Sequence, residues 1–204
     1  MMRTPGSVTF DPDALVQEHD WTAAETRARN ERKLLLVHVE KDDCIGCELL
    51  GGIVYPNPVV AAAIDENFIL LRLDHKDPKV RELNIIWLPT VLVRDVRGQE
   101  HGRHVNAAPP EDFLDFLALG EAHARMRTAS YVRAEQVLAD ALLRRPDGPL
   151  HPELLYWHAI AGYWKGHHDG EFRDHVWSDL RERYPDSIWS HRVPEYLTEH
   201  ASIR

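Results

Sequence analysis

Short runs of consecutive hydrophobic residues alternate with segments of helical periodicity over the first 120 or so residues of the chain. Uninterrupted apolar runs, typical of strands buried on both faces of a sheet, occur at 34–37, 68–71 and 91–93. Helical spacing is found near 15–28, 44–50, 59–64, 80–83 and 113–119. A turn at 95–98 leads to a last strand at 102–105. This order predicts an α/β domain whose mixed central sheet is flanked by helices.

Capping signals predict three helix boundaries in this part of the chain. Acidic residues and a proline in Asp11-Pro12-Asp13-Ala14 predict the start of the first helix. Gly51-Gly52 predict the end of the helix that begins at Cys44. Asn57-Pro58 predict the start of the helix that follows.

From about residue 121 the strand pattern disappears, and apolar residues follow helical spacing to the end of the chain. Four helices are predicted, with their apolar positions in 132–143, 154–164, 172–180 and 188–197. Arg145-Pro146-Asp147 and Tyr184-Pro185-Asp186 recur about 39 residues apart. This spacing resembles tetratricopeptide repeats, although a non-repeating helical extension explains it equally well. We predict one domain at 9–122 and an all-α helical-hairpin domain at 123–204.

Four of the six tryptophans lie in the predicted helical domain, at positions 157, 164, 177 and 189. The simplest prediction is that they pack between helices, and the alternative is an aromatic groove for a peptide.

The charge of the chain limits its partners. The 24 Lys and Arg residues are outnumbered by 33 Asp and Glu, so the net charge is −9, which argues against a general nucleic-acid binder. No segment has the roughly 18 consecutive apolar residues of a membrane span, and no apolar signal segment follows the N-terminus. We therefore expect a cytoplasmic protein, in which a CxxC pair is catalytic or metal-binding rather than a static cross-link.

The candidate chemistry lies at Cys44 and Cys47, the only cysteines of the chain, between a buried strand and a helix. A cysteine at a helix N-terminus is favoured as the thiolate, and Cys47 lies one turn later on the same face. This spacing predicts that Cys44 attacks a substrate disulfide and that Cys47 resolves the mixed disulfide. An inactive remnant and a zinc site completed by His38 and His75 are alternatives, the latter short of fixed ligands.

Acidic residues crowd this dithiol. Glu40, Asp42, Asp43 and Glu48 are offset only by Lys41. Negative neighbours destabilise a thiolate, so we expect a raised pKa for Cys44 and a mildly reactive, reducing dithiol.

The combination of a CxxC pair with a downstream Leu-Pro-Thr at the start of a strand resembles the thioredoxin-like family. The matching pieces are the strand 34–39, Cys44-Ile45-Gly46-Cys47, the strand 68–73, Trp87-Leu88-Pro89-Thr90 and the hairpin at 95–98. The resemblance covers residues 11 to about 120 and implies a thioredoxin fold. This chain departs from the usual thioredoxin pattern with Asp43 before the first cysteine and Ile45-Gly46 between the two.

The resemblance also implies roles for individual residues. Pro89 would be a cis-proline facing the disulfide, and Leu88 would offer backbone groups to an extended substrate. Trp87, Asp43, Ile45 and Gly46 would line the substrate site. His38 occupies the position of a buried aspartate behind the second cysteine, where it would transfer protons to and from Cys47 near neutral pH.

The function expected from the sequence is thiol–disulfide oxidoreduction. The partners would be protein disulfide substrates and a reductase or another electron donor, with no cofactor and no metal. The helical domain would contact partner proteins or mediate oligomerisation. One alternative is a thioredoxin-fold scaffold or co-chaperone with little redox activity, and another is a dithiol that senses peroxide or stress.

Overall fold

The computed structural model describes residues 15–194, and the chain divides into two compact units. The first unit ends at Phe113 and the second begins at Leu114, within helix α4 (Pro110–Arg127). The domain boundary predicted at residues 122 and 123 lies in the same helix. Residues 11–14, where the first helix is predicted to begin, lie outside the described part. Among residues 15–194 no single helix is long and apolar enough to cross a membrane, although the bent pair Ile45–Val54 and Pro58–Asn67 reaches that composition.

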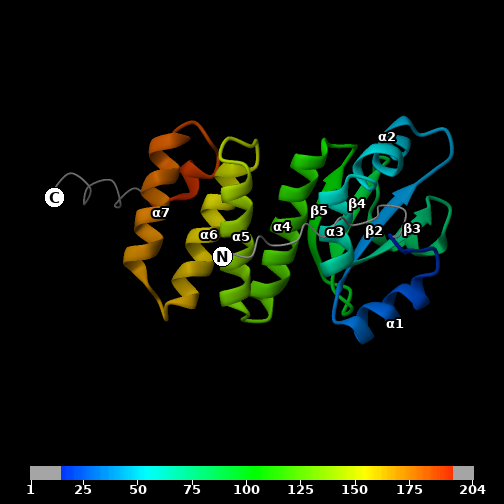
Figure 1. Ribbon diagram of the computed structural model, residues 1–204, viewed down its shortest axis with the longest axis horizontal. Helices are drawn as coiled ribbons and strands as arrows, with labels where there is room; N and C mark the ends of the chain where they lie inside the picture. The colour runs from blue at the N-terminus through cyan, green and yellow to red at the C-terminus, as the bar shows by residue number, and fades with distance from the viewer. Residues whose placement is uncertain (1–14, 195–204) are drawn as a thin grey trace, which may run out of the picture. The chain divides into compact units, whose positions relative to one another are not determined.

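A five-stranded mixed sheet forms the first unit, as the hydrophobic pattern predicts (Figure 1). Its strands, in the order β1-β3-β2-β4-β5, are β1 (Gln17–Glu18), β3 (Phe68–Asp74), β2 (Leu34–Glu40), β4 (Thr90–Arg94) and β5 (Glu100–Val105). Strand β3 pairs in parallel with β1 and β2, whereas β4 pairs antiparallel with β2 and β5. The central position of β2 places its C-terminal end, where the cysteines follow, in the middle of the sheet.

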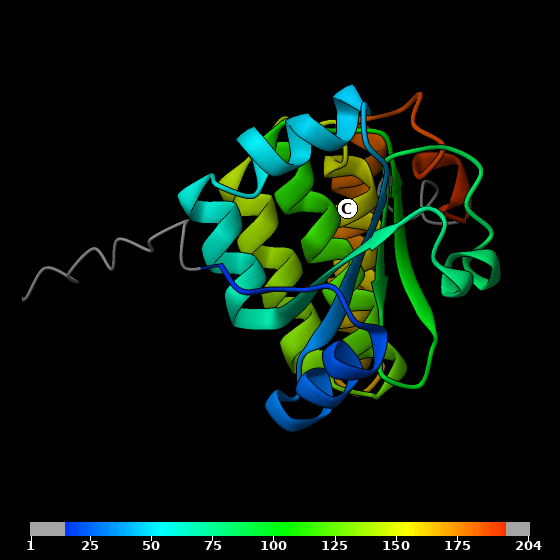
Figure 2. The ribbon, with the colours of Figure 1, turned by 90° about the vertical axis from the view of Figure 1, so that its right-hand side faces the viewer.

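The two faces of β2 meet different helices. Leu35, Val37 and Val39 are buried in one core with α1 (Trp21–Glu31) and the 3₁₀ helix η3 (Pro78–Leu83). His38 points to the opposite face, where its ring meets that of Tyr55 at 5.6 Å. Figure 2 shows α3 and η3 on opposite sides of the sheet.

The prediction that helical structure includes Leu15 is wrong. Gln17 and Glu18 pair with Leu70 and Leu71 of β3 as an edge strand, and α1 begins only at Trp21. Asp20 caps this helix because its Oδ1 accepts a hydrogen bond of 2.7 Å from the N–H of Ala23. This segment forms a strand because it pairs with the backbone of β3. Local periodicity does not reveal a partner so distant in the sequence.

The prediction that Gly51-Gly52 end a helix is also wrong. Helix α2 (Ile45–Leu49) continues through both glycines as the π-helix η2 (Leu50–Val54). A glycine ends a helix when it takes a left-handed conformation, and among the described glycines only Gly98 has a positive φ. Gly51 instead faces the guanidinium of Arg72, which would lie 3.7 Å from a Cβ at this position.

The next helix begins where its capping signal predicts. Asn57 Oδ1 accepts hydrogen bonds from the N–H groups of Val59 and Val60, and Pro58 occupies the first turn of α3 (Pro58–Asn67). Val60, Ala61 and Ile64 are its buried residues.

The second unit is helical, as predicted. After α4 come α5 (Tyr131–Arg144), α6 (His151–Lys165), α7 (Gly170–Arg183) and the short 3₁₀ helix η4 (Ser190–Arg192). The first three helices predicted for this region are confirmed. Of the fourth, predicted over 188–197, the described part contains only η4, and Tyr196 and Leu197 lie outside the described residues.

Three of the four tryptophans of this unit pack together as predicted. The rings of Trp157, Trp177 and Trp189 all lie within 5.5 Å of the Tyr156 ring, centre to centre. Trp164 is an exception, because it is 43% exposed and stacks on Tyr131 rather than entering the core. Its position next to the end of α6 explains this exposure.

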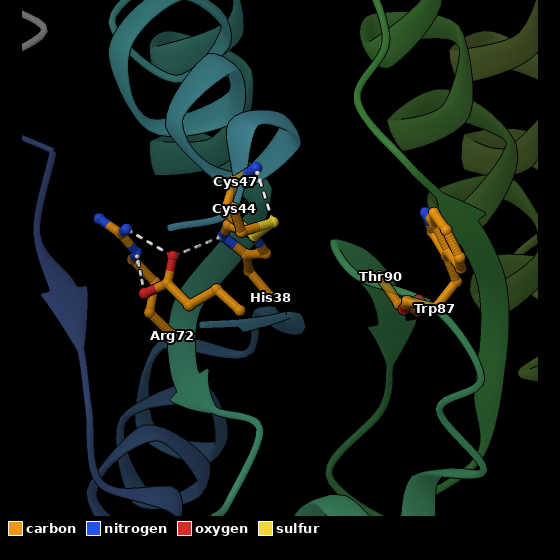
Figure 3. Close-up of a disulfide and its surroundings, with 7 residues drawn as sticks. His38, Cys44, Cys47, Arg72, Trp87 and Thr90 are labelled. Carbon is orange, nitrogen blue, oxygen red and sulfur yellow. Dashed lines mark hydrogen bonds and ion pairs between the residues drawn. A yellow bond between two sulfur atoms is a disulfide. The ribbon is translucent and has the colours of Figure 1, made fainter. Parts of the chain in front are cut away.

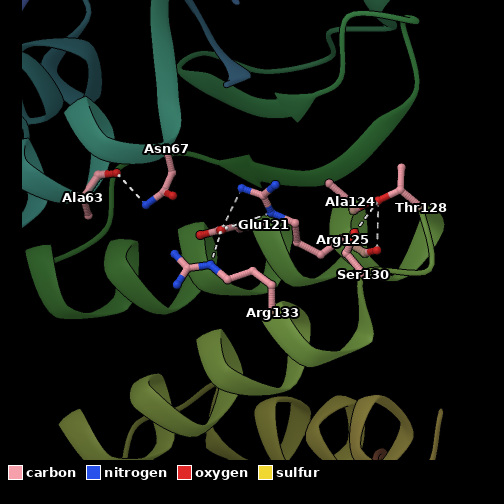
Figure 4. A network of polar contacts seen from close by, with 8 residues as sticks. All are labelled: Ala63, Asn67, Glu121, Ala124, Arg125, Thr128, Ser130 and Arg133. Atoms are coloured by element: carbon pink, nitrogen blue, oxygen red, sulfur yellow. Dashed lines mark hydrogen bonds and ion pairs between the residues drawn. The ribbon is translucent and has the colours of Figure 1, made fainter. Parts of the chain in front are cut away.

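A buried carboxylate joins α4 to α5 (Figure 4). Glu121, on α4, accepts hydrogen bonds from Arg125 on its own helix and from Arg133 on α5, at 3.2–3.3 Å. The two guanidinium groups compensate the burial of the Glu121 charge. This network fixes α5 against the C-terminal part of α4.

Candidate active site

The cysteines lie where the central strand passes into α2. Strand β2 ends at Glu40, and a short turn places Asp43 in a left-handed conformation with a φ of 56°. Cys44 follows as the N-cap of α2, and Cys47 lies one turn later, with the Cα atoms 5.2 Å apart. The two sulfurs form a disulfide (Figure 3). Cys44 is 7% exposed and Cys47 is 5% exposed, so exposure does not distinguish them.

Hydrogen bonding does distinguish the two cysteines. The N–H of Cys47 donates to Sγ of Cys44 at 3.3 Å. After reduction, a donor in this position stabilises the negative charge of a Cys44 thiolate. The geometry therefore favours Cys44 as the nucleophile, in agreement with the sequence-based prediction.

The loop before β4 packs against α2. The Leu88–Pro89 peptide bond is cis. The hydroxyl of Thr90 donates to the carbonyl oxygen of Trp87 at 2.7 Å. The N–H of Asn106 donates to the carbonyl oxygen of Pro89 at 2.8 Å. A Cβ on Gly46 would lie 2.6 Å from Cδ of Pro89, so the predicted site residues Gly46 and Pro89 are in direct contact.

The remaining predicted substrate residues differ in their exposure to solvent. Ile45 is 76% exposed and Trp87 is 63% exposed, whereas Leu88 is half-buried. Asp43 is exposed and lines a cleft on the Cys47 side of the motif.

Replacing Gly46 with Ala is expected to destabilise the oxidised protein by about 1–3 kcal/mol, since the added methyl overlaps the Pro89 ring. This penalty outweighs the roughly 1 kcal/mol by which Ala favours a helix over Gly. Gly52→Ala is the control, because nothing lies within 4 Å of a Cβ there. Urea unfolding measures both changes. Equal stability of the two variants would contradict the contact.

His38 is buried next to Glu40 and Tyr55. Its side chain is completely buried, neither ring nitrogen has a hydrogen-bond partner among the described residues, and Nδ1 is 3.6 Å from Oε2 of Glu40. Burial, and to a smaller extent the Arg72 charge, lower its pKa to about 3. The imidazole is therefore neutral at pH 7. The expectation that it gains and loses a proton near neutral pH is wrong, because the sequence does not reveal this burial.

The sequence does not predict the ion pair that lies beside His38. Arg72 Nε and Nη2 donate to the two oxygens of Glu40 at 2.9 and 2.6 Å (Figure 3). Nη1 of Arg72 donates to Oε1 of Gln17 at 2.9 Å. The pair joins the ends of β2 and β3, where His38 pairs with Arg72 in register. A signal existed, because Arg72 is the one charged residue in the run 68–73.

Tyr55 is a second residue that the sequence does not single out. It is buried at the end of η2, between the rings of His38 and Phe113. Its hydroxyl has no hydrogen-bond partner among the described residues, and burial raises its pKa. Tyr55 and His38 thus place two unpaired polar groups together beneath the dithiol helix.

A cleft of about 690 Å³ opens beside Cys47. Cys47 lines the cleft together with Glu40 and Arg72. Four exposed carboxylates, those of Asp42, Asp43, Glu48 and Asp74, also border it. The acidic crowding predicted around the dithiol is therefore concentrated on one side, next to Cys47.

The described part of the chain offers no set of ligands that would complete a zinc site at the two cysteines. Within residues 15–194 no group of three or more His, Cys, Asp or Glu side chains is arranged to hold a metal ion.

Comparison with known proteins agrees with this geometry. A family model described as thioredoxin-like matches residues 16–94. Residues 16–94 form a thioredoxin-like domain. The match contains the CxxC motif, the Leu88-Pro89-Thr90 segment and strands β1–β4. With its mixed sheet and flanking helices, this domain has the thioredoxin fold. None of the curated proteins matches the chain.

Solved structures similar to the chain include a thioredoxin, a candidate disulphide-isomerase and a domain of DsbD. A Thermus thermophilus thioredoxin has 19% identity and a TM-score of 0.45, over 50% of this chain and 85% of its own. A candidate disulphide-isomerase from Bacteroides thetaiotaomicron has 26% identity and a TM-score of 0.46, over 52% and 91%. The oxidised C-terminal domain of DsbD from Neisseria meningitidis has 20% identity and a TM-score of 0.41, over 48% and 93%.

The thioredoxin-like domain carries its dithiol at the start of the helix that follows the central strand. This combination identifies the chain as a thiol–disulfide oxidoreductase.

Proposed function

We propose that the protein reduces or exchanges disulfides in partner proteins through Cys44 and Cys47. The observation that supports this most directly is the hydrogen bond from the Cys47 N–H to the Cys44 sulfur, because it favours one cysteine as the attacking thiolate. An electron donor, such as a reductase, returns the dithiol to its reduced form.

The reaction consists of two exchanges. The Cys44 thiolate attacks one sulfur of the substrate disulfide, forms a mixed disulfide and releases the other substrate sulfur as a thiolate that takes up a proton. Cys47 then loses its proton and attacks Cys44. This step forms the internal disulfide and releases the second substrate thiol, so the substrate gains two electrons and two protons.

The proton of Cys47 needs an acceptor, and the cleft supplies one. Glu40 lines the same cleft as Cys47, and its carboxylate is held by Arg72. His38 is a poor base, since its pKa is about 3, and both oxygens of Glu40 accept hydrogen bonds from Arg72, so we assign proton transfer to solvent in the cleft. His38 and Tyr55 then have a structural role, since both are buried and their rings are in contact.

We assign the contact with partner proteins, or the assembly of several copies, to the helical unit. This unit contains no cysteine, and α5, α6 and α7 follow one another as paired helices. Such helices form surfaces for protein contacts in repeat proteins. The redox chemistry is thus confined to the first unit.

A trapping experiment tests this function and identifies the partners. In the Cys47→Ser variant the second exchange cannot occur, so the mixed disulfide between Cys44 and a substrate should accumulate and be recovered on non-reducing gels. The double variant Cys44→Ser/Cys47→Ser is the control, and it should capture nothing. Equal capture by both variants would favour the alternative, in which the domain is a scaffold with an idle dithiol.

A further inference from the structure

An exposed apolar stripe begins inside the CxxC motif. Ile45, Leu49 and Ile53, spaced four residues apart along α2 and η2, are 76%, 42% and 57% exposed. Cys47, Leu50 and Val54, on the opposite face of the same helix, are buried. An amphipathic helix normally turns its apolar face inward, so this second apolar face lacks a partner in the described chain.

The acidic cleft borders the same helix. Asp42, Asp43 and Glu48 are exposed, and none of the three forms an ion pair within residues 15–194. Glu40 is neutralised by Arg72, and among residues 15–194 Lys41 is the one other Lys or Arg that lines the cleft. The acidic cleft thus includes Cys47 in its lining, and the apolar stripe begins at Ile45, next to Cys44 in the sequence.

We propose that these two surfaces select disulfides in basic, amphipathic polypeptide segments. Apolar side chains of the substrate pack on Ile45, Leu49 and Ile53, and its Lys or Arg side chains enter the cleft beside Asp43 and Glu48. This inference rests on the proposed function and specifies its substrate class. Ile45 lies between the two cysteines, so a segment on the stripe brings its own sulfur to Cys44.

The charge of the site argues for this occupant over two others. Helices that bind anionic membranes place Lys and Arg beside their apolar face, whereas this stripe is bordered by carboxylates. A second copy of the chain, docked by the same face, would bring two acidic clefts together and be repelled. A segment that is both cationic and apolar is attracted by the acidic cleft, and its apolar side chains cover the exposed stripe.

Two disulfide-bonded peptides of equal length and equal apolar content provide the test, one with two lysines beside its cysteine and the other with two glutamates. The reduced wild-type protein should react about ten-fold faster with the lysine peptide at low salt. At about 1 M salt most of this preference should disappear, because the Debye length falls to roughly 3 Å.

Two variants assign the preference to the cleft. The variant Asp42→Asn/Asp43→Asn/Glu48→Gln should lose most of the preference, and asparagine tolerates the left-handed conformation at residue 43. The control Glu171→Gln/Glu182→Gln/Asp186→Asn removes three exposed carboxylates from the helical unit and should retain it. The ratio of the two rates is the readout, because changes in the reactivity of Cys44 affect both peptides alike.

The stripe has its own test. Ile45→Ser/Ile53→Ser should slow the reaction with the lysine peptide about five- to ten-fold relative to the reaction with hydroxyethyl disulfide. The ratio of the two rates is again the readout, because a change in the reactivity of Cys44 affects both substrates. Val132→Ser/Leu143→Ser, at positions 69% and 80% exposed, is the matched control and should retain the wild-type rate.

The outcomes separate this inference from the proposed function. If the wild-type protein reduces neither peptide nor hydroxyethyl disulfide, the proposed function fails. If it reduces both peptides at equal rates, only the substrate class is wrong. Dimerisation, or binding to phosphatidylserine vesicles, that is abolished by Ile45→Ser/Ile53→Ser would assign the stripe to another occupant and overturn the inference.

Discussion

Replacement of Cys44 with Ser is expected to lower the rate of peptide-disulfide reduction by roughly a thousand-fold or more. A serine hydroxyl at this position has no adjacent general base to activate it, since the neighbouring imidazole of His38 is completely buried and its pKa is about 3. The hydrogen bond from the Cys47 N–H, which would stabilise a thiolate, cannot ionise an alcohol near pH 7. The measurement is the initial rate with a peptide disulfide and a continuous supply of reductant.

Cys47→Ser is the comparison that separates the roles of the two cysteines. This variant should release one equivalent of substrate thiol and then stop, because the mixed disulfide on Cys44 cannot be resolved. The reverse pattern, a burst from Cys44→Ser and none from Cys47→Ser, would make Cys47 the nucleophile. Full turnover by Cys44→Ser would exclude the mechanism.

Acid is expected to destabilise the protein through His38. The pKa of its imidazole is about 3 in the folded protein and 6.5 in the unfolded chain. Between these values the unfolded state binds the additional proton, so the free energy of unfolding falls as the pH is lowered. The stabilisation is complete above pH 6.5 and is lost as the pH falls to 3. Its size is at most about 5 kcal/mol, at roughly 1.4 kcal/mol for each pH unit.

His38→Leu isolates this contribution. Leucine fills a similar space and leaves no unpaired nitrogen against Tyr55, so the variant should be at least as stable as the wild-type protein at pH 5. Other half-buried groups, such as His104 and His158, titrate in both proteins and cancel in the comparison. Urea unfolding of the oxidised forms from pH 7 to pH 4 gives the two slopes. Parallel slopes would mean that His38 is accessible to protons in the folded state.

The central strands and the dithiol could be predicted from local patterns. The apolar runs at 34–37, 68–71 and 91–93 locate β2, β3 and β4, because strands buried on both faces lose their alternation. The capping signal at Asn57-Pro58 locates α3, because a cap acts through neighbouring residues alone. The CxxC pair beside a strand end predicts the disulfide for the same reason.

The errors share a different cause, which is contact between residues far apart in the chain. Gln17 belongs to a strand because β3 offers backbone partners, and Gly51 of η2 faces the guanidinium of Arg72. His38 follows the same rule, since its low pKa arises from packing on Tyr55 and from burial under α2 and η2.

The sequence by itself therefore determined the class of fold, the position of the dithiol between a buried strand and a helix, and the acidic character of the site, since these depend on local order and composition. Only the tertiary structure decided which carboxylates border the cleft beside Cys47, that Ile45, Leu49 and Ile53 remain exposed, and that His38 is neutral. These properties depend on solvent access and on the placement of charges. Folding sets both by bringing distant segments together, which no local pattern encodes.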